Sequence, residues 1–163
     1  MAFSTIEVVP TLDTSAYADN DVLFTSTAVK LPHRHCKVLS ISAIWNDTEA
    51  ASDDIIVMFF KENTNALGTI NTAASISGAQ IKENVLLGAD RLVNDKETSL
   101  GVPTLLVSQH INDEGASTSG QNNYVLTEGS TKNTCYVQGL LEVGGGSGTF
   151  DADSLVLYIS VEY

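Results

Sequence analysis

The sequence predicts an all-β protein, a two-sheet antiparallel β-sandwich of jelly-roll type with one short helix. Apolar and polar residues alternate with a period of two along several segments, which is the pattern of strands with one buried face. Between these segments Gly, Asn, Asp and Ser recur at short spacing, as they do in sandwiches and barrels. Only one segment has a helix start signal.

The expected strands, in chain order, are 6–9, 22–31, 38–46, 54–61, 85–93, 104–111, 134–143 and 155–163. Segment 38–46 is expected to bury every second residue from Leu39 to Trp45, because serines occupy most of its other face. Segment 54–61 is apolar on both faces, as a strand buried between two layers would be. The last segment is expected to point every second residue from Leu155 to Tyr163 inward.

One short helix is expected at 79–86, because Ser77 and Gln80 have the spacing of a capping box. The composition does not change along the chain, and no Pro- or Ser-rich linker interrupts it. We therefore expect a single β-sandwich domain over residues 1–163, with residues 1–7 as a candidate N-terminal arm that could add to the sheet edge of a neighbour.

The charge balance excludes two classes of partner. Eight basic and twenty acidic residues give a net charge of −12, which opposes binding to a nucleic-acid backbone or to an anionic membrane. No apolar run reaches the length of a membrane span, and the start MAFSTIEVVP does not resemble a secretory signal. We expect a reducing compartment, with both cysteines as free thiols.

Residues 31–36, LPHRHC, are the most chemically suggestive stretch. In an extended segment the rings of His33 and His35 would project to the same side, as a metal site requires. Further ligands could come only from His110, Cys36, Cys135 and carboxylates, and no CxxC or HExxH spacing is present. We expect no metal and no other cofactor.

The same stretch is a local positive spot in an acidic chain. Lys30, Arg34 and Lys37 place three of the eight basic residues within eight positions. Such a spot suits an acidic patch on a partner or on a neighbouring subunit, although a solvated loop explains it equally well. The candidate partner-binding residues are Lys30, His33, Arg34, His35 and Lys37.

Other chemical-looking stretches have simpler interpretations. GGGSG at 144–148 lacks both the GK[ST] ending and the following helix of a phosphate loop, so it is expected to be a connection between strands. The acidic turns at 47–54 and 19–21 could hold calcium, but they lack EF-hand spacing and Asp is a common turn residue. No GxSxG motif or other catalytic signature is present, so we do not expect an enzyme.

Four blocks of the sequence resemble structural proteins of tailed bacteriophages. TLDTSAYADNDVLF at 11–24 resembles their TLDTSAYASGDVL signature, and 38–64 matches their next block, in which a second strand ends in an aromatic pair, here Phe59 and Phe60. Segments 71–88 and 148–163 resemble their short helix and their C-terminal strand. The resemblance covers most of the chain except about 95–132, and it departs from the family at Asp19-Asn20 and in the LPHRHC loop.

The resemblance implies a non-catalytic virion component with a β-sandwich fold, most often a capsid decoration protein on the surface of the assembled capsid. It also implies a major capsid protein as partner and a homo-oligomer, commonly a trimer. Such a protein would stabilise the shell by mass action, and many weakly bound copies would add up by multivalency.

Two alternatives remain open. The same sandwich could be a neck, tail or fibre-base component of the virion. Because jelly rolls often bind sugars, it could instead be a carbohydrate-binding module. The aromatic residues that could form its stacking platform are Trp45, Tyr124, Tyr136 and Tyr158. Trp45 shares its face with Leu39 and Ile41, which favours a core position.

Overall fold

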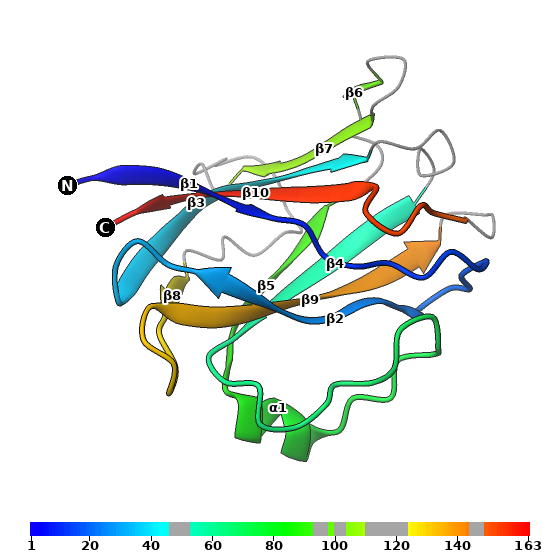
Figure 1. Ribbon diagram of the computed structural model, residues 1–163, viewed down its shortest axis with the longest axis horizontal. Coiled ribbons are helices and arrows are strands. Elements are labelled where there is room, and N and C mark those ends of the chain that lie inside the picture. Colours follow the sequence, from blue (N-terminus) through cyan, green and yellow to red (C-terminus); the bar gives the residue numbers. More distant parts are fainter. Residues whose placement is uncertain (46–52, 93–97, 100–103, 110–123, 144–148) are drawn as a thin grey trace, which may run out of the picture.

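The computed structural model describes residues 1–45, 53–92, 98–99, 104–109, 124–143 and 149–163, and it forms two antiparallel sheets packed face to face (Figure 1). The six-stranded sheet has the order β1 (Phe3–Val8), β10 (Leu155–Glu162), β3 (His35–Trp45), β7 (Thr104–Gln109) and β6 (Thr98–Ser99), and β8 (Val125–Thr127) also pairs with β3. The four-stranded sheet has the order β2 (Val22–Lys30), β9 (Thr134–Val143), β4 (Asp53–Phe60) and β5 (Leu86–Leu92). The predicted two-sheet β-sandwich is confirmed.

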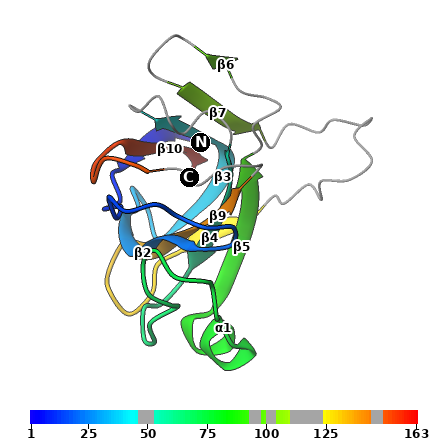
Figure 2. The same ribbon diagram turned by 90° about the vertical axis from the view of Figure 1, so that its right-hand side faces the viewer.

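The two layers are seen end-on in Figure 2, where the sheet with β10, β3 and β7 lies above β2, β9 and β4. Helix α1 (Gly78–Asn84) lies below the second sheet. Its expected capping box is present, because the Ser77 hydroxyl accepts the Gln80 N–H and the Gln80 side chain accepts the Ser77 N–H. The helix ends two residues earlier than expected, because Val85 takes a left-handed conformation with φ of 56°.

The N-terminus is a strand of the sheet and not a free arm. Residues 3–8 pair with β10 in one uninterrupted antiparallel register, from Phe3 opposite Glu162 to Val8 opposite Leu157. Residues 3–7 of the expected arm are therefore paired within the chain's own sheet, and their addition to the sheet edge of a neighbour stays a prediction. Ile6 and Val8 are buried in the core, and this apolar contact fixes the segment in its own sandwich.

Alternation correctly predicts the inner face of β10 but fails once in β3. Leu155, Leu157, Ile159 and Val161 are fully buried, whereas Tyr163, at the end of the sandwich, is 41% exposed. In β3 the register against β10 shifts between Ser160 and Val161, which is a β-bulge.

The bulge changes which residue of β3 is buried. Val38 lies in the core, and Leu39, which was expected there, is only half-buried. Beyond the extra residue, Ile41, Ala43 and Trp45 point inward as predicted. A bulge of this kind moves every residue on one side of it to the opposite face, so a strict period of two cannot locate it.

Residues 61–77 and α1 cover part of the outer face of the second sheet, which explains why β4 is apolar on both sides. Phe60 is fully buried there, while Ile56 and Met58, on the same face, are only half-buried. The Gln138 side chain, also buried, donates to the Leu67 carbonyl at 2.7 Å and ties this segment to β9.

Asn84 holds the segment together at the end of α1. It is fully buried, its side-chain oxygen accepts the N–H groups of Thr64 and Asn65 at 2.7 and 3.1 Å, and its amide donates to the Asn65 carbonyl at 2.9 Å. Three hydrogen bonds to one buried side chain make this residue the fixed point of the segment, because unpaired buried groups are costly.

We expect Asn84→Ala to lower the free energy of unfolding by about 2–3 kcal/mol, because it leaves three backbone groups without their partner. Asn63→Ala is the matched control, since Asn63 is exposed, and it should change stability by less than about 0.5 kcal/mol. Urea denaturation followed by circular dichroism measures both. Equal losses in the two variants would contradict this role of Asn84.

Candidate functional site

The LPHRHC stretch connects β2 to β3 and crosses from one sheet to the other at the end of the sandwich where both termini lie (Figure 1, left). Leu31 is buried and its N–H donates to the Asn133 carbonyl at 2.9 Å. Cys36 is buried at the other end of the stretch. The residues between them, 32–35, are exposed. The two buried ends therefore hold four exposed residues at the surface.

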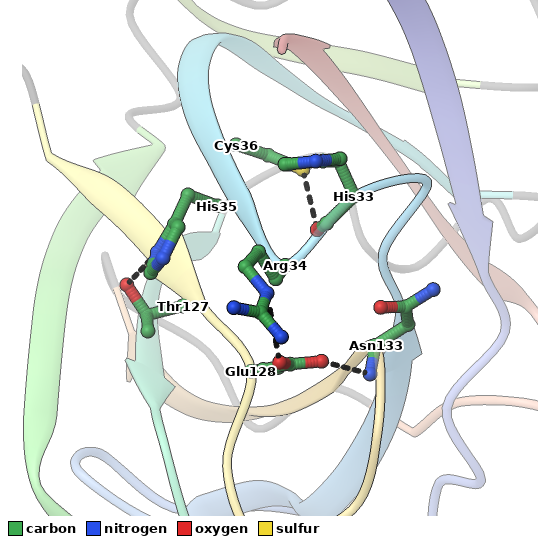
Figure 3. A network of polar contacts seen from close by, with 7 residues as sticks. All are labelled: His33, Arg34, His35, Cys36, Thr127, Glu128 and Asn133. Carbon is green, nitrogen blue, oxygen red and sulfur yellow. Dashed lines mark hydrogen bonds and ion pairs between the residues drawn. The ribbon is translucent and has the colours of Figure 1, made fainter.

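A second loop, residues 128–133, packs against this one (Figure 3). Glu128 donates its N–H to the Arg34 carbonyl at 2.9 Å, and its carboxylate lies 3.4 Å from Arg34 Nε and accepts the Asn133 N–H at 2.7 Å. The Arg34 side chain remains 64% exposed, so the ion pair contributes little to stability. Its effect is to orient a guanidinium group that still faces solvent.

The two histidines do not share one side of the chain. The His33 ring stacks on Tyr163, with centroids 6.3 Å apart and planes 11° apart. The His35 ring lies on the other side of the loop, with Nδ1 3.4 Å from Thr127 Oγ1 (Figure 3). The metal alternative required both rings on one side, and that geometry is not formed. In the part of the chain that the structure describes, no three His, Cys, Asp or Glu residues cluster as metal ligands would.

Cys36 and Cys135 face the core from opposite sheets, on β3 and β9. The Cys36 thiol donates to the His33 carbonyl at 3.2 Å. Burial raises the pKa of the Cys36 thiol, and burial together with the nearby Cys36 raises the pKa of Cys135 to about 12. Both groups are therefore neutral thiols at physiological pH, unsuited to nucleophilic or metal chemistry.

The lysines of the stretch lie at the same end of the molecule, and the fold adds one more. Lys30 is exposed and donates to Thr134 Oγ1 at 3.0 Å, and Lys37 is exposed on β3 opposite Glu162 of β10. Lys132, exposed in the 128–133 loop, joins them. The linear sequence gave no signal for Lys132, because it lies about a hundred residues from Lys30. We call the basic end the set Lys30, His33, Arg34, His35, Lys37 and Lys132.

The opposite end is acidic. Two loops meet there, because Leu12 donates its N–H to the Ala152 carbonyl at 2.8 Å (Figure 1, right). Tyr17 and Phe150 anchor them: their rings lie 5.3 Å apart, and Phe150 stacks on the buried Trp45 at 4.6 Å. We call the acidic end the set Asp13, Asp19, Asp21, Asp151 and Asp153. The loops that meet here, 9–21 and 149–154, carry no Lys or Arg, whereas the basic end also holds Glu128 beside Arg34 and Glu162 opposite Lys37.

The acidic turn at 19–21 has a structural role. Asn20 is left-handed, with φ of 64°, and the buried Asp21 carboxylate accepts the Ala18 N–H at 2.7 Å. These are the roles that Asn and Asp take in turns. Of the other acidic turn proposed for calcium, residues 47–52 lie outside the described residues, as do His110 and the GGGSG stretch.

The candidate sugar-stacking residues do not form one platform. Trp45 is fully buried, and Tyr124 is 8% exposed, with its hydroxyl donating to Asp90 at 3.0 Å. Tyr136 and Tyr158 are half-buried on β9 and β10, which belong to different sheets. A ring that stacks on a sugar must be exposed, so Trp45 and Tyr124 cannot do so.

Comparison with known proteins leaves the family unassigned. No family model and no curated protein matches this chain. Among solved structures, a chain titled Desmodium yellow mottle tymovirus is similar over 98% of this chain and 79% of its own, with 10% sequence identity and a TM-score of 0.32. No conclusion about function rests on a likeness of that size. Within the described residues, no helix is both long and apolar enough to cross a membrane.

Both thiols should resist modification in the folded protein. We expect a maleimide or disulfide reagent at about pH 8 to label neither cysteine until denaturant is added, because burial raises both pKa values and blocks access. Mass spectrometry before and after unfolding measures the labelling. Rapid labelling of the native protein would contradict the core position of the thiols.

Proposed function

We propose that this protein is a virion structural protein of a tailed bacteriophage that binds the outer surface of the assembled capsid and stabilises it without a chemical step. The observation that carries the proposal is the basic end, where four of the eight Lys and Arg residues of a chain with net charge −12 are gathered and exposed. The sequence resemblance supports the virion, and the charge arrangement supports adhesion through one defined end.

The position of the basic end opposite the acidic loops would orient the protein as it approaches an acidic surface. The basic end is attracted while the acidic end, at the far side of the sandwich, is repelled, so the productive orientation is favoured before contact. The partner that fits is an acidic patch on the major capsid protein. Arg34 suits it particularly, because a guanidinium can bind a carboxylate with two parallel hydrogen bonds.

The contact loop is also preorganised. Leu31 and Cys36 are buried on either side of it, and Glu128 and Asn133 bind it from the neighbouring loop. Glu62 holds that neighbouring loop in turn, accepting the Ser130 N–H at 2.9 Å and the Ser130 hydroxyl at 2.8 Å, and these bonds lower the pKa of Glu62. A loop that is already ordered loses less conformational entropy on binding.

The remaining parts of the proposal follow from the resemblance. They are a position on the capsid surface after synthesis in the host cytoplasm, and a trimeric assembly. We also propose a jelly-roll winding for the sandwich, which the strand order β1-β10-β3-β7 opposite β2-β9-β4-β5 supports. Stabilisation would come from mass action, since a protein that binds only the intact shell shifts the equilibrium away from disassembly.

Reversing charge at the basic end should abolish capsid binding. We expect Arg34→Glu combined with Lys37→Glu to weaken binding to purified capsids by more than about a hundredfold, because both positions would then repel an acidic patch. Cosedimentation with capsids measures binding, and circular dichroism checks the fold. Unchanged affinity would remove this loop from the interface.

Lys132→Glu tests the residue that only the fold places at this end. It should weaken binding by about tenfold or more, whereas Lys82→Glu, the same charge change on the exposed surface of α1, should have little effect. Raising sodium chloride from about 0.05 to about 0.5 M should weaken binding of the parent protein, because salt screens exposed charges. Equal effects of the two variants would indicate a response to net charge alone.

The position in the virion separates the proposal from its alternatives. Immunogold labelling of parent virions should spread over the whole head, at a copy number near that of the major capsid protein. Label confined to one vertex or to the tail would indicate a neck, tail or fibre-base part. Absence from the particle would contradict a virion role, and a glycan array would then test sugar binding.

A further inference from the structure

Among the described residues, strand β1 is an open edge of the six-stranded sheet. It pairs with β10 on one side and stands at the end of the strand order. One edge of the other sheet differs: β2 has register shifts against β9, and its first residue exchanges hydrogen bonds with Asn71 and Thr72. Irregular and covered edges resist pairing with another chain, whereas a straight and regular one invites it.

The outward groups of β1 can be assigned from its hydrogen bonds. Ala2 and Tyr163 exchange both backbone bonds, at 2.9 and 3.0 Å, so by alternation Ser4, Ile6 and Val8 also bond to β10. The N–H and C=O groups of the residues between them therefore point away from the sheet. These residues are Phe3, Thr5 and Glu7, all exposed.

Apolar side chains gather along this edge. Of the seven large exposed hydrophobic residues in the described part of the chain, three belong to β1 or flank it. Met1 is 97% exposed, Phe3 65% and Val9 44%. Free edges are commonly protected by lysine, proline or a bulge. Here Glu7 is the only charged residue between Met1 and Val9, and the first proline comes at position 10.

We propose that β1 pairs antiparallel with β1 of a second copy, about a twofold axis at Thr5, so that the two six-stranded sheets become one. In this register Thr5 lies opposite its own counterpart, Phe3 opposite Glu7, and Met1 opposite Val9. The three outward residues of each strand exchange about six backbone hydrogen bonds in all. The exposed Met1 and Val9 of one copy then lie opposite Val9 and Met1 of the other.

Charge selects this register and this partner. A twofold axis at Glu7 would place two carboxylates directly opposite one another, which is destabilising. A twofold axis at Phe3 would let the two strands form fewer backbone hydrogen bonds. With the axis at Thr5 the strand is complementary to itself, because each Glu7 faces an uncharged Phe3. A second copy therefore fits without any change to the chain.

This contact does not depend on the proposed capsid function, and salt separates the two. Two copies with net charge −12 repel one another, so added salt should strengthen the β1 contact. The basic end should show the opposite response, since its attraction to an acidic surface is screened. The proposed trimer would use another surface.

Sedimentation velocity of the full chain, from about 1 to about 100 µM, tests the proposal. The expected result is a concentration-dependent association in which Thr5→Pro raises the dissociation constant by roughly thirtyfold, because one outward donor is lost in each copy. Proline is tolerated there since the Thr5 N–H does not bond to β10. A monomer at all concentrations, or an oligomer of any size unaffected by Thr5→Pro, would overturn it.

Crosslinking provides a second readout if Thr5→Pro fails to fold. In Thr5→Cys the two introduced thiols would lie within disulfide distance across the axis, and oxidised glutathione should convert the protein to a covalent dimer. The two thiols lose two protons and two electrons, which reduce one oxidised glutathione to two thiols. Ser160→Cys, opposite Thr5 on β10, is the control and should give no covalent dimer. Equal crosslinking of both variants would refute pairing along β1.

Discussion

Contact between the inner faces of the two sheets is the constraint on which the rest of the structure depends. Phe24, Trp45 and Phe59 come from three different strands of both sheets and are fully buried together. The strands that this contact fixes decide where each loop begins and ends. The meeting of loops 31–34 and 128–133, which builds the basic end, therefore follows from this core contact, to which the first loop adds Leu31.

Sequence periodicity predicted the class of fold and most of the strands, because burial on one face leaves a period of two that can be read locally. It failed at Leu39, where a bulge moves the pattern by one residue, and it missed the short strands β6 and β8. Both the bulge and the two short strands are decided by how strands pair within the sheet. The pairing of residues 3–8 within the chain's own sheet was not foreseen either, since the partner of β1 lies at the far end of the chain.

For the candidate site, the sequence predicted the exposed basic residues but not their arrangement. The divergence of His33 and His35 depends on Tyr163 and Thr127, which come from other strands. Lys132 was missed because only the fold brings its loop to Arg34. Charge count indicated an acidic protein with one basic spot, while the structure adds that this spot and the loops with Asp13 and Asp151 lie at opposite ends of the sandwich. The proposed adhesion through one end depends on that arrangement.

The pairing of Ala2 with Tyr163 has a practical consequence for anyone who attaches a second protein to this one. Both chain ends leave the sandwich beside the basic end. A domain fused to either terminus would crowd the surface proposed to bind the shell, and it would be displayed poorly. Cargo inserted in the loop that holds Asp13 and Asp19 would instead project from the far end, away from that surface.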